Sequence, residues 1–543
     1  MQSLSPSDIS RRVSGVSEFL TPSSILTPNG IPAAGNNTQT HYIRRIGSFR
    51  NSVRNLLLPI IRWETPILGK LQARVRSPFL DVYFTQTANL GSHTFYVLLL
   101  PISFWFGFSD FGSVLVFILA AGVYMTNFLK DFCCLPRPLS PPLHRLTMSK
   151  DAALEYGFPS THTANAISVS LFFMDTINSS KPNLNPFFYY FLHFLNCIYI
   201  FSLVAGRIYC GMHGFLDLFG GALIGSIVYF WGAPIFSRIL FYITWSNTYW
   251  ALAVIPIVLI LIRIQPEPAD DCPCFEDSVA FLGVLMGQYL GEWQLRYQCY
   301  RVDNLLQTTD RASLGAIDKI YLKAREKYIL EWGTLKQEKL TPGTMLLRFI
   351  LGSLLIGVWK VYSKKIFHII LPPLWRRIEK FGLSMPRRFY VPASQYDDVP
   401  SDKIPDNTVR IFPILVEPDS SDNDSECENS KSSSVENSNI LKFKSKNFKN
   451  ETVGPQSTAE VYEALAYREQ QLNQNMIENK TSLKNSKIPP SLNQEKIPKE
   501  MVPEIIVPRV HYDVEVITKL LVYAGISAIA LYFDRILFSV LNI

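Results

Sequence analysis

The feature that most constrains the fold is a series of nine apolar stretches, each close to the length that crosses a bilayer. A transmembrane helix needs about 20 apolar residues, and stretches of this length and number are not typical of the buried helices of soluble proteins. They lie at about residues 93–109, 111–129, 162–178, 186–205, 215–232, 248–264, 278–293, 345–361 and 517–541. The sequence therefore predicts an all-α, polytopic helical membrane protein with about eight to nine transmembrane helices.

The composition agrees with this class and excludes several others. Only 18% of the residues are charged and 48% are hydrophobic, whereas soluble domains contain about 25% charged residues. The 52 basic and 45 acidic residues leave a net charge of 52 − 45 = +7, which is too small on this chain to indicate a nucleic-acid partner. The eight cysteines show neither zinc-ligand spacing nor the pattern of a disulfide framework.

Polar segments flank and divide the apolar stretches. Residues 1–60 are rich in Ser, Pro, Asn and Thr and are expected to form a disordered, basic arm without a cleavable signal peptide. Residues 61–92 are expected to be an amphipathic segment at the membrane surface. The other expected regions are a core at 93–232, further membrane helices at 233–293, a basic polar loop at 294–344 with a helix near 313–332, a membrane helix or hairpin at 345–376, a disordered polar insertion at 390–510 and a C-terminal membrane helix at 516–541.

The distribution of charge predicts which segments share a face of the membrane. Basic loops stay in the cytosol, so the basic polar loop is expected there and the acidic loop 265–277 on the opposite face. Counting spans from that loop places 130–160 and 206–214 on the far face as well. Two alternatives stay open for the N-terminus: either 93–129 crosses an odd number of times, or residues 78–92 also enter the membrane.

Three clusters of polar residues lie beside the spans, where charged groups are costly and usually functional. They contain Lys130 with Arg137-Pro138; Pro159-Ser160-Thr161-His162; and Arg207 with His213 and Asp217. Lys130 follows the stretch 111–129, and His162 begins the next one, 162–178. Arg207 follows the stretch 186–205, which crosses the membrane back to the same face. The topology therefore brings all three clusters to one face of the membrane.

These side chains suit the binding and transfer of a phosphoryl group. The three cations of the clusters can surround a dianion, and the helix that starts at Ser160 offers free N–H groups to a phosphate. His213 and Asp217 are four residues apart and would share a face of a helix. There the carboxylate can fix the tautomer of the imidazole and leave its other nitrogen free to attack.

Together the clusters resemble the pattern of the type 2 phosphatidic acid phosphatase superfamily, which is Lys-x6-Arg-Pro, Pro-Ser-x-His and Arg-x5-His-x3-Asp. The likeness covers about residues 93–232, with one departure: Gly206 stands where many members have Ser. The surrounding residues are similar to the sphingosine 1-phosphate phosphatase branch, above all to its fungal dihydrosphingosine 1-phosphate phosphatases, over roughly residues 55–375. The segments that carry this second likeness are 137–142, 155–162 and 209–213.

The resemblance implies a six-helix type of lipid phosphatase core in the endoplasmic reticulum membrane, with its active site on the lumenal face. It implies a metal-independent phosphoric monoester hydrolase that acts on sphingoid long-chain base 1-phosphates in sphingolipid metabolism. We expect no cofactor and no metal ion, and the oligomeric state is left open. The implied roles are nucleophile for His213, which forms a phosphohistidine, orienting carboxylate for Asp217, general acid and base for His162, and substrate binding for Lys130, Arg137, Ser160 and Arg207.

Three alternatives stay open. The chain could be a broader lipid phosphatase for phosphatidate, lysophosphatidate or isoprenoid pyrophosphates, because the motifs bind phosphate and do not select the lipid. It could be an anion or lipid transporter, although transporter sites usually lie near the midplane. It could also be an inactive scaffold, although every expected catalytic position is filled. The Ser-rich acidic tract at 420–434 is further expected to be phosphorylated in the cytosol.

Overall fold

The structure, a computed structural model, is helical almost throughout. Three predictions fall wholly or mostly outside the described residues: the arm over residues 1–33, the disordered insertion over most of 390–510 and the phosphorylated tract at 420–434. The chain forms two units, residues 1–371 with 515–543 and residues 372–514, and the three polar clusters belong to the first. The structure describes residues 34–37, 39–91, 93–140, 142–147, 154–245, 249–308, 314–328, 341–382, 387–395, 445–446, 452–453 and 511–541.

The described strands are short and pair in twos. Strand β1 (Tyr390–Val391) pairs in parallel with β4 (His511–Tyr512), and β2 (Ser445–Lys446) pairs antiparallel with β3 (Thr452–Val453). The helices are α3 (Gln39–Val75), α4 (Pro78–Thr87), η1 (Ala88–Gly91), α5 (His93–Trp105), α6 (Ser109–Cys133), α7 (Thr161–Ser179), η3 (Lys181–Asn183), α8 (Pro186–Tyr209), α9 (Phe215–Ile227), η4 (Val228–Gly232), α10 (Ala233–Trp245), η5 (Tyr249–Ala253), α11 (Val254–Ile264), α12 (Cys274–Thr308), α13 (Ala316–Tyr328), α14 (Pro342–Lys380), η7 (Ala393–Gln395), α16 (Asp513–Ala528), η9 (Ile529–Phe533) and α17 (Asp534–Leu541).

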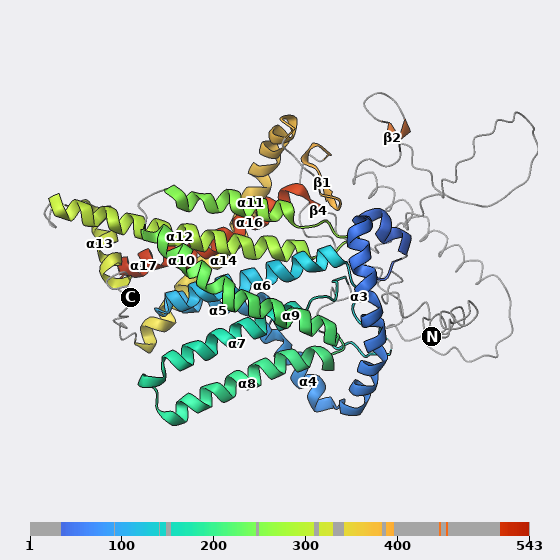
Figure 1. The fold of residues 1–543 in the computed structure, drawn as a ribbon. Helices are drawn as coiled ribbons and strands as arrows, with labels where there is room; N and C mark the ends of the chain where they lie inside the picture. The colour runs from blue at the N-terminus through green and yellow to red at the C-terminus, as the bar shows by residue number, and fades with distance from the viewer. Residues whose placement is uncertain are drawn as a thin grey trace, which may run out of the picture. The chain divides into compact units, whose positions relative to one another are not determined.

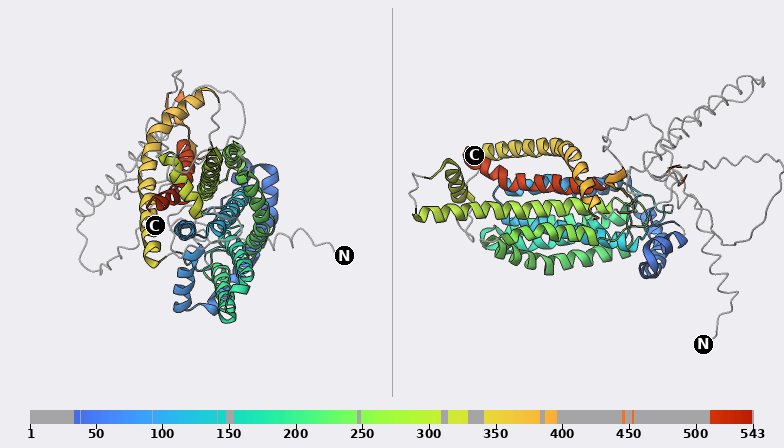
Figure 2. Two further views of the ribbon diagram at one scale, coloured as in Figure 1. Left: turned by 90° about the vertical axis from the view of Figure 1, so that its left-hand side faces the viewer. Right: turned by 90° about the horizontal axis from the view of Figure 1, so that it is seen from above.

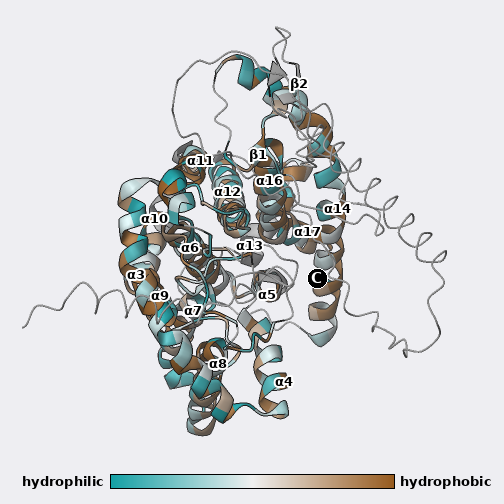
Figure 3. Cartoon of the chain, turned by 90° about the vertical axis from the view of Figure 1, so that its right-hand side faces the viewer, coloured by the Kyte–Doolittle hydropathy of each residue, from teal (hydrophilic) through white to brown (hydrophobic). Residues whose placement is uncertain are grey.

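Long apolar helices confirm the predicted membrane class. Of the apolar window of α6, 61% is buried inside the protein, whereas only 11% of that of α8 is buried. Helix α6 is therefore a core helix and α8 a peripheral one (Figure 3). The exposed apolar side chains of α8 suit contact with lipid. The total of eight to nine crossings stays a prediction. Among the described residues, the helices long and apolar enough to cross a bilayer are Ser109–Cys133, Pro186–Tyr209, Phe215–Ile239, Pro342–Lys380 and Asp513–Leu541.

Helices α6, α7, α8, α9 and α12 run side by side (Figures 1 and 2). Glycines allow α9 to approach α7 closely. A Cβ atom on Gly221 would lie 2.5 Å from the carbonyl oxygen of Ser160, and one on Gly225 would lie 2.3 Å from that of Ala164. Small residues four apart permit such close contact between membrane helices. The start of α7 is thereby held against the first turns of α9.

The expectation of a disordered arm up to residue 60 is wrong for residues 39–60, which form the first part of α3. Polar side chains of this segment pack on the protein instead of facing water. Arg54 is 2% exposed and donates to the carbonyl oxygen of Gly35, and Arg50 donates to that of Phe132 at 3.0 Å. Composition alone cannot distinguish a polar helix that binds exposed carbonyl groups from a solvated arm.

Two later segments also differ from the expected organisation. The first part of the expected polar loop, residues 294–308, belongs to α12, because Arg296 pairs with Glu292 one turn earlier at 2.8 Å. Arg301 pairs with Asp318 of α13 at 2.6 Å and so joins the two helices. At 345–376 the structure has a single helix, α14, and no hairpin.

The close contact between α7 and α9 should contribute to the thermal stability of the protein. Gly225→Ala places a methyl group against the α7 backbone, and such overpacking costs about 1–3 kcal/mol. We expect a lower melting temperature of the purified protein in detergent. Gly357→Ala in α14 is the matched control, because an added Cβ there meets nothing within 4 Å. Equal melting temperatures for the two variants would contradict this account of the packing.

Candidate active site

The first polar cluster lies where α6 ends. Lys130 is in the last turn of this helix. The backbone amide of Cys134, four residues later, donates to the Lys130 carbonyl oxygen at 2.9 Å. Cys134 then takes a left-handed conformation with φ of 49°, which turns the chain into a buried extended segment that contains Arg137. Both cations are buried, Lys130 at 4% and Arg137 at 4% exposure. Buried charges of this kind require partners.

The second cluster begins α7. Ser160 is fully buried and is the N-cap of the helix, since its Oγ accepts from the Thr163 amide at 3.3 Å and from the Thr163 hydroxyl at 3.0 Å. His162 follows in the first turn and lies within electrostatic range of Arg207. Gly91 of η1 leaves room for this imidazole, because a Cβ there would lie 2.9 Å from the His162 Cδ2 atom.

The third cluster is built on a tight helix ending. The amide of Gly211 donates to the Ile208 carbonyl at 3.0 Å and that of Met212 to the Arg207 carbonyl at 3.1 Å. With Gly211 at φ of 63°, this is the Schellman pattern, which favours glycine at this position. The motif therefore ends α8 at Tyr209 and turns the chain sharply toward α9.

His213 lies in that turn, before α9, and not on a helix with Asp217 as the four-residue spacing suggested. The N-cap of α9 is Gly214, and Asp217 reaches back so that its Oδ2 accepts from the Gly214 amide at 2.9 Å. The same oxygen lies 3.5 Å from His213 Nδ1. The carboxylate therefore faces the imidazole although the two residues do not share a helix face.

Two backbone–backbone hydrogen bonds and one hydrogen bond from a side chain to a backbone carbonyl tie the three clusters into one site. Each cluster is linked to the other two, so none of the three segments can move independently. The links run from the Gly157 amide to the Leu135 carbonyl at 2.9 Å, from the Ser160 amide to the Asp217 carbonyl at 3.0 Å, and from Arg137 Nη1 to the Met212 carbonyl at 3.0 Å.

The position of Arg137 determines the tautomer of His213. Arg137 Nη1 lies 3.1 Å from His213 Nε2. A guanidinium can only donate, so Nε2 must accept and the ring proton must be on Nδ1, which faces Asp217. Nε2 then carries the free electron pair that a nucleophile needs.

Electrostatics keep this imidazole neutral. His213 is 2% exposed, and burial lowers the pKa of its imidazole well below the ordinary value, with the neighbouring cations lowering it further. A neutral imidazole is the form that can attack phosphorus at neutral pH.

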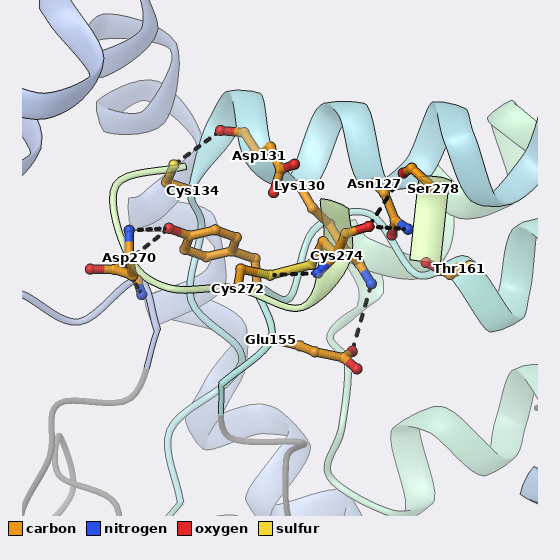
Figure 4. Close-up of a disulfide and its surroundings, with 12 residues drawn as sticks. Asn127, Lys130, Asp131, Cys134, Glu155, Thr161, Asp270, Cys272, Cys274 and Ser278 are labelled. Atoms are coloured by element: carbon orange, nitrogen blue, oxygen red, sulfur yellow. Dashed lines mark hydrogen bonds and ion pairs between the residues drawn. A yellow bond between two sulfur atoms is a disulfide. The ribbon is translucent and has the colours of Figure 1, made fainter. Parts of the chain in front are cut away.

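Glu155 was not among the predicted site residues, yet its carboxylate lies among the cations. Its Oε2 is 2.8 Å from Arg137 Nη2 and 3.8 Å from Lys130 Nζ, as Figure 4 shows for Lys130. Arg207, 5% exposed, also interacts electrostatically with Glu155. In the sequence, Glu155 was noted only as the first residue of segment 155–162, which carries the likeness to the sphingosine 1-phosphate phosphatases but gives this residue no role.

Helix α3 supplies further residues that the sequence did not reveal. Glu64 is 2% exposed, and its carboxylate accepts from the Leu216 amide at 3.2 Å, next to the turn that holds His213. A carboxylate at a helix N-terminus is stabilising. Gln72 donates to the carbonyls of His144 and Tyr209 at 2.8 and 2.7 Å. Helix α3 thus braces the loops around the site.

The departure at Gly206 has a steric reason. A Cβ atom on Gly206 would lie 3.0 Å from the ring of Phe84 in α4. Phe84 is itself buried and packs against Tyr209, with ring centroids 4.7 Å apart. A serine at position 206 would therefore require the aromatic pair to shift.

The sequence showed no pattern of a disulfide framework, but the structure has a disulfide beside the site. It joins Cys272, in the loop between α11 and α12, to Cys274, the first residue of α12 (Figure 4). This loop packs on the end of α6: Gln265 donates to Asp131 at 2.6 Å, and Asn127 donates to the Cys274 carbonyl at 2.8 Å. Two cysteines with one residue between them gave no sign of this pairing.

Comparison with known proteins identifies the relatives of the chain. Residues 111–249 match the model of the PAP2 superfamily. A dihydrosphingosine 1-phosphate phosphatase of Schizosaccharomyces pombe is 37% identical over 335 residues, which cover 61% of this chain and 73% of the relative. A protein of the same name from Saccharomyces cerevisiae is 38% identical over 259 residues, covering 48% and 64% of the two chains.

A more distant relative is the sphingosine-1-phosphate phosphatase 2 of Mus musculus, which is 29% identical over 220 residues, or 40% of this chain and 60% of the relative. No solved structure matches the chain. The region that matches the family model, residues 111–249, contains all three polar clusters. The chain therefore belongs to the PAP2 superfamily, in the branch that contains the dihydrosphingosine 1-phosphate phosphatases.

Proposed function

We propose that the protein hydrolyses sphingoid long-chain base 1-phosphates, such as dihydrosphingosine, phytosphingosine or sphingosine 1-phosphate, to the free base and phosphate. The names of the relatives support this substrate class. The observation that carries the chemistry is the contact of Arg137 with His213 Nε2 at 3.1 Å, because it puts a phosphate-binding cation beside a nucleophilic nitrogen.

In the first step, His213 Nε2 attacks phosphorus while the bond from phosphorus to the lipid oxygen breaks. His162 gives its proton to the departing lipid alcohol. Arg137 leaves Nε2 and, with Lys130 and Arg207, binds the phosphoryl oxygens as their charge develops. Asp217 stabilises the positive imidazole that forms, and Ser160 is proposed to bind the phosphate as well.

In the second step, water replaces the lipid alcohol. His162, now neutral, accepts a proton from this water, whose oxygen attacks the phosphohistidine. The bond between phosphorus and His213 Nε2 breaks, phosphate leaves, and Arg137 can return to the free nitrogen. The two histidines thus end the cycle in the states in which they began it.

We further propose that the enzyme lies in the endoplasmic reticulum membrane with this site facing the lumen. The disulfide between Cys272 and Cys274 supports that orientation, because disulfides form and persist in oxidising compartments such as the lumen. The prediction that the acidic loop 265–277 faces away from the cytosol is consistent with it.

The proposed role of His213 as the nucleophile can be tested by substitution. Membranes carrying the wild-type protein are expected to release phosphate from dihydrosphingosine 1-phosphate in the presence of EDTA, and His213→Ala is expected to reduce the rate by at least about 1,000-fold. His193→Ala, at the far end of α8, should keep full activity. Wild-type activity that survives in His213→Ala would rule out this nucleophile, and no release by folded wild-type protein would rule out the substrate.

The proposed roles of His162 as general acid in the first step and general base in the second can be tested with two substrates. His162→Ala is expected to slow hydrolysis of the lipid phosphate by about 100- to 10,000-fold. With 4-nitrophenyl phosphate, whose leaving group needs no proton, the same variant should release a rapid burst of nitrophenol and then turn over slowly, because the phosphohistidine lacks its general base. A uniform loss with both substrates and no burst would contradict the assignment.

A further inference from the structure

We propose that Glu155 binds the ammonium group of the sphingoid base and thereby selects amine-bearing lipid phosphates over other lipid phosphates. This inference rests on the proposed function and concerns the lipid rather than the phosphate. None of the three sequence motifs includes Glu155, and the reaction itself does not require its carboxylate.

Glu155 is the accessible member of a buried charge cluster. Its side chain is 32% exposed, whereas those of Lys130 and Arg137 are each 5% exposed. The carboxylate therefore lies on the open side of the cations, where the ligand must enter. Its main chain is held by a different nitrogen of Arg137, because the Glu155 carbonyl oxygen accepts from Arg137 Nε at 3.3 Å. The side chain can consequently turn while the backbone stays in place.

The carboxylate occupies cation contacts that a phosphate needs. Oε2 lies 2.8 Å from Arg137 and 3.8 Å from Lys130, the pair that Figure 4 shows. The same two side chains are the proposed phosphate ligands. A bound dianion would take over these contacts and leave Glu155 beside like charge. Such a juxtaposition is unfavourable in a partly buried site unless the carboxylate gains another cation.

A sphingoid base 1-phosphate brings that cation with it. Its ammonium group is on the carbon next to the one that carries the phosphate ester, so it enters the site together with the phosphate. A carboxylate and an ammonium form a strong charge-assisted hydrogen bond. Phosphatidate has an acyl ester at the corresponding carbon, and an alkyl phosphate has only hydrogen. With these ligands the Glu155 carboxylate has no ammonium partner and lies next to the phosphate dianion. The repulsion between the two negative groups weakens the binding of lipid phosphates that carry no amine.

The test compares Glu155→Gln with the wild type on three substrates: dihydrosphingosine 1-phosphate, its N-acetyl derivative and octadecyl phosphate. We expect Glu155→Gln to reduce kcat/KM for the amine substrate by about 10- to 100-fold. The other two substrates, which carry no cation, should be hydrolysed by the variant at least as well as by the wild type. An equal loss on all three substrates would overturn the inference and assign Glu155 to the positioning of Arg137.

Two controls complete the design. Glu155→Asp keeps the charge and should retain most of the preference for the amine substrate. Asp175→Asn removes one exposed carboxylate at the other end of α7 and should leave the preference unchanged.

The wild type alone gives a second readout that does not depend on the folding of a variant. It should hydrolyse both octadecyl phosphate and the N-acetyl derivative at least about 10-fold less efficiently than dihydrosphingosine 1-phosphate. Equal efficiency on the three substrates would overturn the selection by Glu155 and leave the proposed function intact. No hydrolysis of dihydrosphingosine 1-phosphate by the wild type would instead overturn the proposed function.

Discussion

The site depends on the burial of positive side chains at one end of the helices. Lys130, Arg137 and Arg207 are each 4–5% exposed, and buried cations are stable only beside groups that compensate their charge. The protein provides part of that compensation through Glu155 and through backbone carbonyls such as that of Met212. A phosphate can provide the rest, so the same electrostatic demand that shapes the loops also favours binding of the substrate.

Much of this arrangement could be predicted from the sequence. Each of the nine apolar stretches is helical over most of its described residues, since a long run of apolar residues leaves the backbone little alternative in a membrane. Lys130 follows one apolar stretch, His162 begins the next, and Arg207 follows the one after that. Because successive membrane helices run in opposite directions, this order predicts that the three clusters lie at the same face of the membrane. The family pattern added roles for these residues, which remain a proposal.

Other features could not be predicted because they depend on tertiary contacts. The polar residues of α3, such as Arg54 and Glu64, are buried only because loops far away in the sequence present backbone groups to them. Glu155 opens segment 155–162, which carries the branch likeness, but nothing in that segment indicates that its carboxylate contacts buried cations. The position of His213 before α9 follows from the left-handed Gly211, which ends α8. In each case the partner determines the role of the residue.

We propose that His213 Nε2 is the nucleophile and that Arg137 stays hydrogen-bonded to it until phosphate binds. The most direct measurement is a structure of the wild-type protein with orthovanadate in EDTA. The account predicts vanadium bonded to His213 Nε2, with Arg137 and Arg207 on its oxygens and His162 on the opposite side. Vanadate bound elsewhere, or Arg137 still hydrogen-bonded to Nε2 with vanadate present, would contradict it.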